Sequence, residues 1–114
     1  MKILLLDRNL FGASRVESNL RQNGHEVATR GQLEDGDFDC LVLNIGNPSW
    51  TPENIPSGVE NARTRFPDAK LVGFCGHREV GKWRAAQGAG LQMASNDAMM
   101  SDANAVVAPV VRDA

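Results

Sequence analysis

The sequence predicts an α/β domain built on a doubly wound, five-stranded parallel sheet. Five short apolar runs bounded by polar or turn residues indicate five strands. Segments with the spacing of amphipathic helices separate most of these runs, and strands joined by helical crossovers form parallel sheets. The chain has 114 residues, enough for one core, so we expect a single domain over residues 1–114.

The first third of the chain contains a strand, a helix and a second strand. Residues 3–6 are apolar and run up to Asp7, which indicates a buried strand. The helix that follows has Asn9 as its N-cap and Gly24 in the left-handed position beyond its end. Residues 25–29 are more polar and are typical of a strand at the edge of the sheet.

The second crossover is predicted to be short. Residues 30–39 leave room for one helical turn between two glycines, so the helix at this point is reduced to a turn or lost. A strongly apolar strand over 40–45 ends in a loop over 46–52, whose composition is typical of turns. A helix is predicted over about 53–66, or from Ser57 onward if Ser57 is its cap.

The last third of the chain repeats the alternation of strand and helix. Its predicted elements are a strand over 71–75, a helix over about 78–87, a weak strand over 91–94 and a final helix to about residue 111. Ser95 or Asn96 caps the final helix, and Pro109 interrupts it near its end. The five strands fit a flavodoxin-like sheet with the order 2-1-3-4-5.

Charge and hydropathy exclude several classes of protein. The formal net charge is −2 and the pI is about 5.6, so the chain lacks the basic surface that binds nucleic acid or an anionic membrane. No apolar run approaches the ~20 residues of a membrane span, and the first run is shorter than the core of a secretory signal peptide. We therefore expect a cytoplasmic protein that binds neither nucleic acid nor membrane.

The cysteine pattern indicates reduced, buried thiols rather than a metal centre. Cys40 and Cys75 lie in apolar strands, and with His25 and His77 they match no zinc-ligand spacing. In neighbouring parallel strands we expect Asn44 beside Cys75, so Cys40 lies about four residues below Cys75, on the order of 13 Å away. A disulfide needs Cα atoms within about 7 Å, so we expect no disulfide between Cys40 and Cys75. Cys75 ends its strand, where partial exposure is expected, although nothing in the sequence indicates a reactive thiolate.

Four segments, in this order and spacing, resemble the receiver domain of two-component response regulators. Residues 2–7 resemble the first strand with its acidic end, and 39–45, followed by Pro48, resemble the strand that bears the phospho-accepting aspartate. Residues 71–76 resemble the fourth strand, and 85–91 resemble the Ala-Gly-Ala-Asp stretch before the fifth. The resemblance covers the whole chain and implies a signalling domain.

The phosphorylation site itself departs from the receiver pattern. Receiver domains have two acids after the first strand, where this chain has Asp7 and then Arg8. They have an aspartate on the third strand, where this chain has Asn44, and a threonine or serine after the fourth, where it has Cys75. Ser95 stands in place of the lysine that follows the fifth strand. The resemblance thus implies a degenerate phosphoacceptor pocket formed by these five residues.

The chemistry of these replacements predicts a domain without the receiver reaction. The amide of Asn44 is a poor nucleophile, and Asp7 is the one carboxylate left where Mg²⁺ needs several oxygen ligands. We expect Asp7 to pair with Arg8 or to cap the next helix, and Asn44 to hydrogen-bond loop amides. No catalytic residue, metal or cofactor is predicted, and the chain is not expected to be an enzyme.

The leading hypothesis is a stand-alone pseudo-receiver that acts by phosphorylation-independent contact with a signalling protein or with a second copy. By resemblance, the contact face is formed by the fourth helix, fifth strand and fifth helix of the receiver pattern. That face would include Lys82, Trp83, Ala86, Gln92, Met99 and Met100. Trp50 and Trp83 are aromatic residues of the kind that form interface hot spots, and Met99 and Met100 suit an adaptable contact.

The alternative is a module, or an enzyme, that binds a small molecule or anion in the crevice at the carboxyl ends of the strands. Residues 7–12 match neither the dinucleotide-binding motif nor the P-loop, which weighs against a phosphate-binding loop. Asp7, His77 and Ser95 have suitable locations for a catalytic group, but no spacing requires them to meet. Both hypotheses remain open at the level of sequence.

Overall fold

The predicted sheet is present, with all five strands parallel and in the order β2-β1-β3-β4-β5. The structure, a computed structural model, describes residues 1–108. The strands are β1 (Lys2–Leu6), β2 (Glu26–Arg30), β3 (Cys40–Asn44), β4 (Lys70–Cys75) and β5 (Gln92–Ser95). The helices are α1 (Leu10–Gln22), α2 (Ile55–Arg65), α3 (Val80–Gly88) and α4 (Asn96–Val107).

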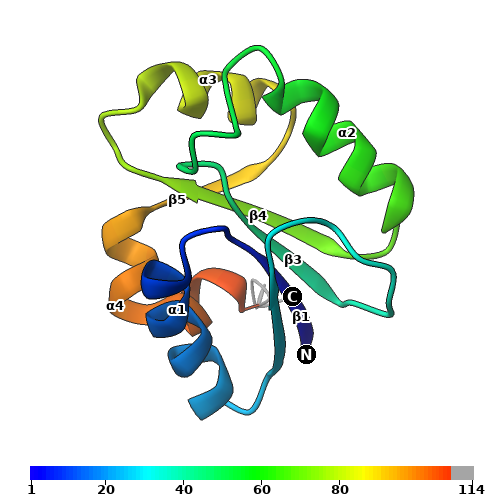
Figure 1. The fold of residues 1–114 in the computed structure, drawn as a ribbon, viewed down its shortest axis with the longest axis vertical. Coiled ribbons are helices and arrows are strands. Elements are labelled where there is room, and N and C mark those ends of the chain that lie inside the picture. The colour runs from blue at the N-terminus through cyan, green and yellow to red at the C-terminus, as the bar shows by residue number, and fades with distance from the viewer. Residues whose placement is uncertain (109–114) are drawn as a thin grey trace, which may run out of the picture.

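The helices cover both faces of the sheet and make a three-layered domain (Figure 1). Ile3 and Leu5 of β1 pack in the core beneath α1 and α4, whereas Leu4 and Leu6 pack beneath α2 and α3. Because successive side chains of a strand point to opposite faces, a strand covered on both sides must be apolar throughout. This explains the continuous apolar runs from which the strands were predicted.

Local chemistry explains several of the helix ends. The Asn9 side chain accepts a hydrogen bond from Gly12 N at the start of α1, and Gly24 has a φ of +86° beyond its end. Ser95 caps α4 by accepting from Ala98 N. Helix α2 begins at Ile55, close to the predicted residue 53, so the alternative start with Ser57 as cap is wrong; Pro56 lies in its first turn. Proline fits there since its missing N–H needs no partner.

The crossover between β2 and β3 contains no helix, as the sequence predicted. Residues 31–39 form an irregular loop in which Leu33 and Phe38 pack partly against the core beneath α2. Figure 1 shows this segment passing beside the sheet without a helical turn. This crossover therefore adds no helix to the α2 face of the sheet.

The register between β3 and β4 and the course of the last helix differ from the prediction. The strand register places Cys40 opposite Lys70 and Asn44 opposite Phe74, one residue from the predicted pairing of Asn44 with Cys75. Helix α4 ends at Val107 and has a kink at Asp102, whose backbone is not helical. The predicted continuation to residue 111, with Pro109, lies outside the described residues. None of the helices within residues 1–108 is long and apolar enough to cross a membrane.

Candidate functional site

A crevice of about 310 Å³ opens at the carboxyl ends of β1, β3 and β4. It lies where the resemblance places the phosphoacceptor pocket. Most of its polar lining comes from amide side chains and one carboxylate: Asn9, Asn44, Asn47, Asn96 and Glu79. Parallel strands bring their carboxyl ends to the same edge of a sheet, so residues far apart in sequence meet here.

Asp7, at the end of β1, is a buried carboxylate held by amide donors. Its side chain is 1% exposed. Oδ1 accepts hydrogen bonds from Asn9 N at 2.8 Å and from Asn47 Nδ2 at 3.2 Å, and Oδ2 accepts from Asn44 Nδ2 at 2.9 Å. Hydrogen bonds to a charged acceptor are stronger than neutral ones, which offsets the cost of burying the charge. Both oxygens of Asp7 are therefore engaged within the chain.

The prediction that Arg8 pairs with Asp7 is wrong. Arg8 is exposed, and its Nε donates to Gly31 O at 3.2 Å, on the loop that follows β2. Its backbone N donates to Asn47 Oδ1 at 3.0 Å. Successive side chains of an extended chain point in opposite directions, so Arg8 leaves the crevice where Asp7 enters it.

Asn44, which the resemblance places at the phosphoacceptor position, bridges Gly46 and Asp7. Its Oδ1 accepts from Gly46 N at 3.0 Å, which is the loop-amide contact that the sequence predicted. Its Nδ2 donates to Asp7. An amide can accept on one side and donate on the other, whereas a carboxylate at this position would have to face Asp7 with a second negative charge.

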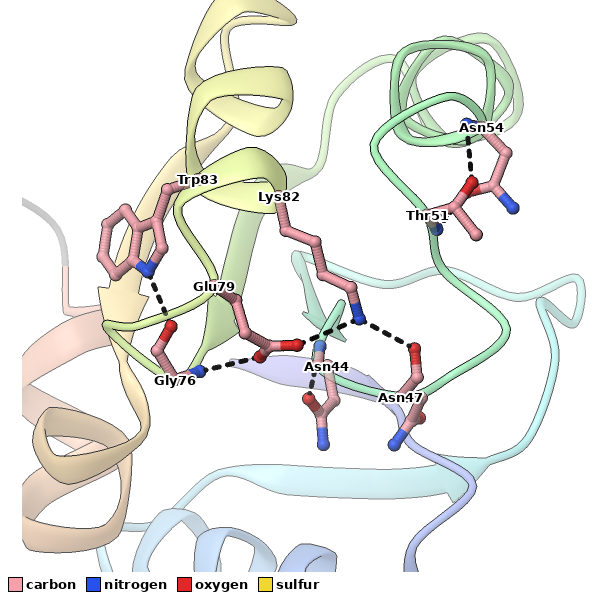
Figure 2. A network of polar contacts seen from close by, with 9 residues as sticks. Asn44, Asn47, Thr51, Asn54, Gly76, Glu79, Lys82 and Trp83 are labelled. Carbon is pink, nitrogen blue, oxygen red and sulfur yellow. Dashed lines mark hydrogen bonds and ion pairs between the residues drawn. The ribbon is translucent and has the colours of Figure 1, made fainter.

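An ion pair closes one side of the crevice, and sequence analysis did not find it. Glu79 Oε2 accepts from Gly76 N at 3.2 Å, and its Oε1 lies 3.2 Å from Lys82 Nζ. Lys82 Nζ also lies 3.3 Å from Asn47 O and donates to it. Figure 2 shows the Lys82 chain extending from α3 towards the loop after β3. This pair connects the loops that follow β3 and β4.

The prediction that Lys82 lies on an outer contact face is therefore wrong. Its side chain is 14% exposed and directed inward, because its ammonium group has partners inside the site. The only sequence signal was the i,i+3 spacing of Glu79 and Lys82, which also occurs on solvated helix faces.

Cys75 is fully buried, which contradicts its expected partial exposure. The reason is that β4 is an inner strand and the thiol packs with Ala86 and Leu91 in the core beneath α2 and α3. Burial raises the pKa of Cys75 to about 11, and the Glu79 carboxylate acts in the same direction. Burial likewise raises the pKa of Cys40 to about 11. Neither thiol has the thiolate character that redox chemistry requires.

Two of the predicted contact residues are not accessible. Met99 and Ala86 are both fully buried, so neither can contact a partner. Met99 faces the sheet because α4 needs an apolar residue beneath its first turn. Trp83 is half-buried and its Nε1 donates to Gly76 O at 3.0 Å, and Met100 is half-buried at the crevice.

The donor set does not fit Mg²⁺. Magnesium prefers an octahedral set of oxygen ligands that includes carboxylates. Asp7 has both oxygens engaged, and the two asparagines beside it present N–H groups to it rather than free oxygens. Within residues 1–108 no three side chains among His, Cys, Asp and Glu gather to hold a metal ion.

Solved structures share this architecture. A response regulator from Thermotoga maritima matches with a TM-score of 0.68 and 13% identity, over 93% of this chain and 96% of that one. The chain has the fold of a receiver domain. A response regulator protein from Burkholderia pseudomallei with a phosphorylated aspartic acid, calcium ion and citrate matches with a TM-score of 0.75 and 15% identity, over 94% of this chain and 66% of that one.

A solved structure with a different description also shares this architecture. A protein from Rhodopirellula baltica, described as an adenylate cyclase, matches with a TM-score of 0.65 and 15% identity, over 92% of this chain and 90% of that one. No family model matches the sequence, and comparison with curated proteins finds no match. At these identities the comparisons show the fold, and the function must be argued from the site.

Proposed function

We propose that this receiver-fold domain is a pseudo-receiver that acts in signalling by binding another protein, without being phosphorylated. The observation that carries the proposal is the buried Asp7 carboxylate, which three N–H groups of the chain hold in place. A receiver reaction needs that carboxylate free to bind a cation. Here it anchors the loops around the crevice.

The rest of the crevice supports the same proposal. Phosphoryl transfer to a protein needs an anionic oxygen nucleophile and positive charge around the phosphoryl oxygens. Asn44 supplies a neutral amide, and the Lys82 ammonium is already paired with Glu79. In this proposal the domain has no catalytic residue and needs no cofactor or metal.

The partner is proposed to bind at the β5 edge of the sheet, between α3 and α4. This edge corresponds to the fourth helix, fifth strand and fifth helix of the receiver pattern. Among residues 1–108, β5 pairs with β4 alone, so its other side offers backbone groups to a partner. Gln92 is exposed on β5, and on α3 Arg84 is exposed and Trp83 is half-buried. The partner is another signalling protein or a second copy, in the cytoplasm, and neither nucleic acid nor membrane takes part.

Site-specific photo-crosslinking in the native cell tests this face. A photoreactive residue at Gln92 is expected to give one adduct of defined mass, in equal yield with and without acetyl phosphate. The control is the same residue at Ser18, which is exposed on α1, an element outside the proposed face. An adduct that requires acetyl phosphate, equal adducts from both positions, or none from Gln92 would contradict the proposal.

A further inference from the structure

A second hollow, of about 430 Å³, lies outside the crevice on the α2 side of the sheet. Its volume falls within the ~300–1,000 Å³ of small-molecule sites. Its lining includes Leu6 at the end of β1, Gln32 after β2, Trp50 after β3, and Asn61 on α2. We call this hollow the α2 groove.

The α2 groove exists because the crossover between β2 and β3 has no helix. The irregular loop at Gly31 and Gln32 leaves the flank of α2 open near the end of β1. In the order β2-β1-β3-β4-β5, the chain leaves β1 on one side and β3 on the other, which makes the β1–β3 boundary the topological switch point. Ligands of open α/β sheets bind outside the carboxyl ends of the strands at such a point.

An indole ring forms one wall of the α2 groove. Trp50 is half-buried, and its ring packs directly on the α2 backbone at Gly58. A Cβ at Gly58 would lie 2.5 Å from Cζ3 of Trp50, so any larger residue would displace the ring. The absence of a side chain at Gly58 thus sets the position of an aromatic surface beside the groove.

One charged side chain lines the α2 groove, and it is a cation. Arg8 is oriented by the bond from its Nε to Gly31 O. It belongs to none of the four ion pairs found within residues 1–108. No acidic residue lines the groove. The guanidinium therefore has further N–H donors to offer an anion, in the forked geometry that suits a carboxylate or phosphate.

We propose that the α2 groove binds a small planar aromatic molecule that carries one negatively charged group. The ring packs against Trp50, and the anionic group pairs with Arg8. The amides of Gln32 and Asn61 lie on the rim, where they can hydrogen-bond polar substituents of the ring. This site is separate from the crevice and does not depend on the pseudo-receiver proposal.

Three probes of matched shape test this proposal by NMR on the ¹⁵N-labelled protein. 2-Naphthoate has the ring and the charge, 2-naphthamide has the ring alone, and acetate has the charge alone. 2-Naphthoate is expected to shift the Trp50 indole N–H and the Gly58 amide signals saturably. It should bind about tenfold more tightly than 2-naphthamide, as expected for one charge-assisted pair. Acetate should shift neither signal.

Two variants separate the charge from the ring surface. Arg8→Gln should make 2-naphthoate and 2-naphthamide bind equally, while the dispersed spectrum shows that the fold is intact. Gly58→Ala should weaken both naphthalene probes, because it displaces Trp50. Saturation at other residues, equal binding of the two naphthalene probes to the unmodified protein, or binding that Arg8→Gln leaves unchanged would overturn the proposal.

Discussion

Replacement of Asp7 by alanine is expected to lower the free energy of unfolding by about 3 kcal/mol, since it leaves buried amide donors without their charged acceptor. The donors are Asn9 N, Asn44 Nδ2 and Asn47 Nδ2, and Asn47 is itself buried. Chemical denaturation followed by circular dichroism measures the change.

The sign of this change in stability shows whether Asp7 holds the surrounding loops in place or serves as a cation ligand. A carboxylate kept among other acids for a cation repels its neighbours, so its removal would raise stability in the absence of metal. Asp37→Ala is the matched control, because Asp37 is an exposed acid on the loop before β3; it should change stability by less than about 0.5 kcal/mol. An unchanged or raised stability of Asp7→Ala would contradict the anchor role.

Asn44→Asp is expected to destabilise the protein by about 2–4 kcal/mol at neutral pH, because it replaces an N–H donor to Asp7 with a second negative charge in a partly buried site. In the present structure Asn44 Nδ2 lies 2.9 Å from Asp7 Oδ2. The introduced carboxylate would face Asp7 rather than Arg8, whose side chain is directed to Gly31.

The pH dependence of this variant follows from the same contact. Burial and the Asp7 charge raise the pKa of the introduced carboxylate in the folded state. The loss of stability caused by the new charge is therefore absent below the unfolded pKa of about 3.9. It grows as the pH rises through the raised folded pKa. Denaturation at pH 5 and pH 8 should show a smaller loss at pH 5. Asn44→Ala, the uncharged control, should show the same loss at both pH values; a charge-independent loss in Asn44→Asp would contradict the account.

Most of the fold could be predicted because its signals are local or are imposed by burial. The three inner strands, β1, β3 and β4, belong to a sheet covered on both faces, so each shows as an apolar run. Asn9 and Gly24 mark the two ends of α1 by their own backbone chemistry. The start of α2 was predicted only as about residue 53 or as Ser57, because Pro56 is compatible both with a break before a helix and with its first turn.

The crevice was predicted in position but not in its contacts. Asp7, Asn44 and the crevice at the strand ends follow from the order of the strands. The directions of Arg8 and Lys82 do not, because both side chains are long and each has a backbone carbonyl among its partners. Asn47 went unnoticed because an asparagine beside Pro48 is typical of any turn. Met99 was assigned to the surface because adjacent methionines on a helix do not reveal which one faces the core.

Phosphotransfer to the unmodified protein tests the central claim most directly. The protein is incubated with acetyl phosphate and Mg²⁺, and its intact mass is measured before and after treatment with hydroxylamine, which cleaves acyl phosphates. A receiver domain known to be phosphorylated on aspartate serves as the positive control. The account predicts no added phosphoryl group under conditions that label the control, because Asn44 cannot accept it and Asp7 is held by three N–H groups. Stoichiometric, hydroxylamine-sensitive phosphate on this chain would contradict the pseudo-receiver proposal.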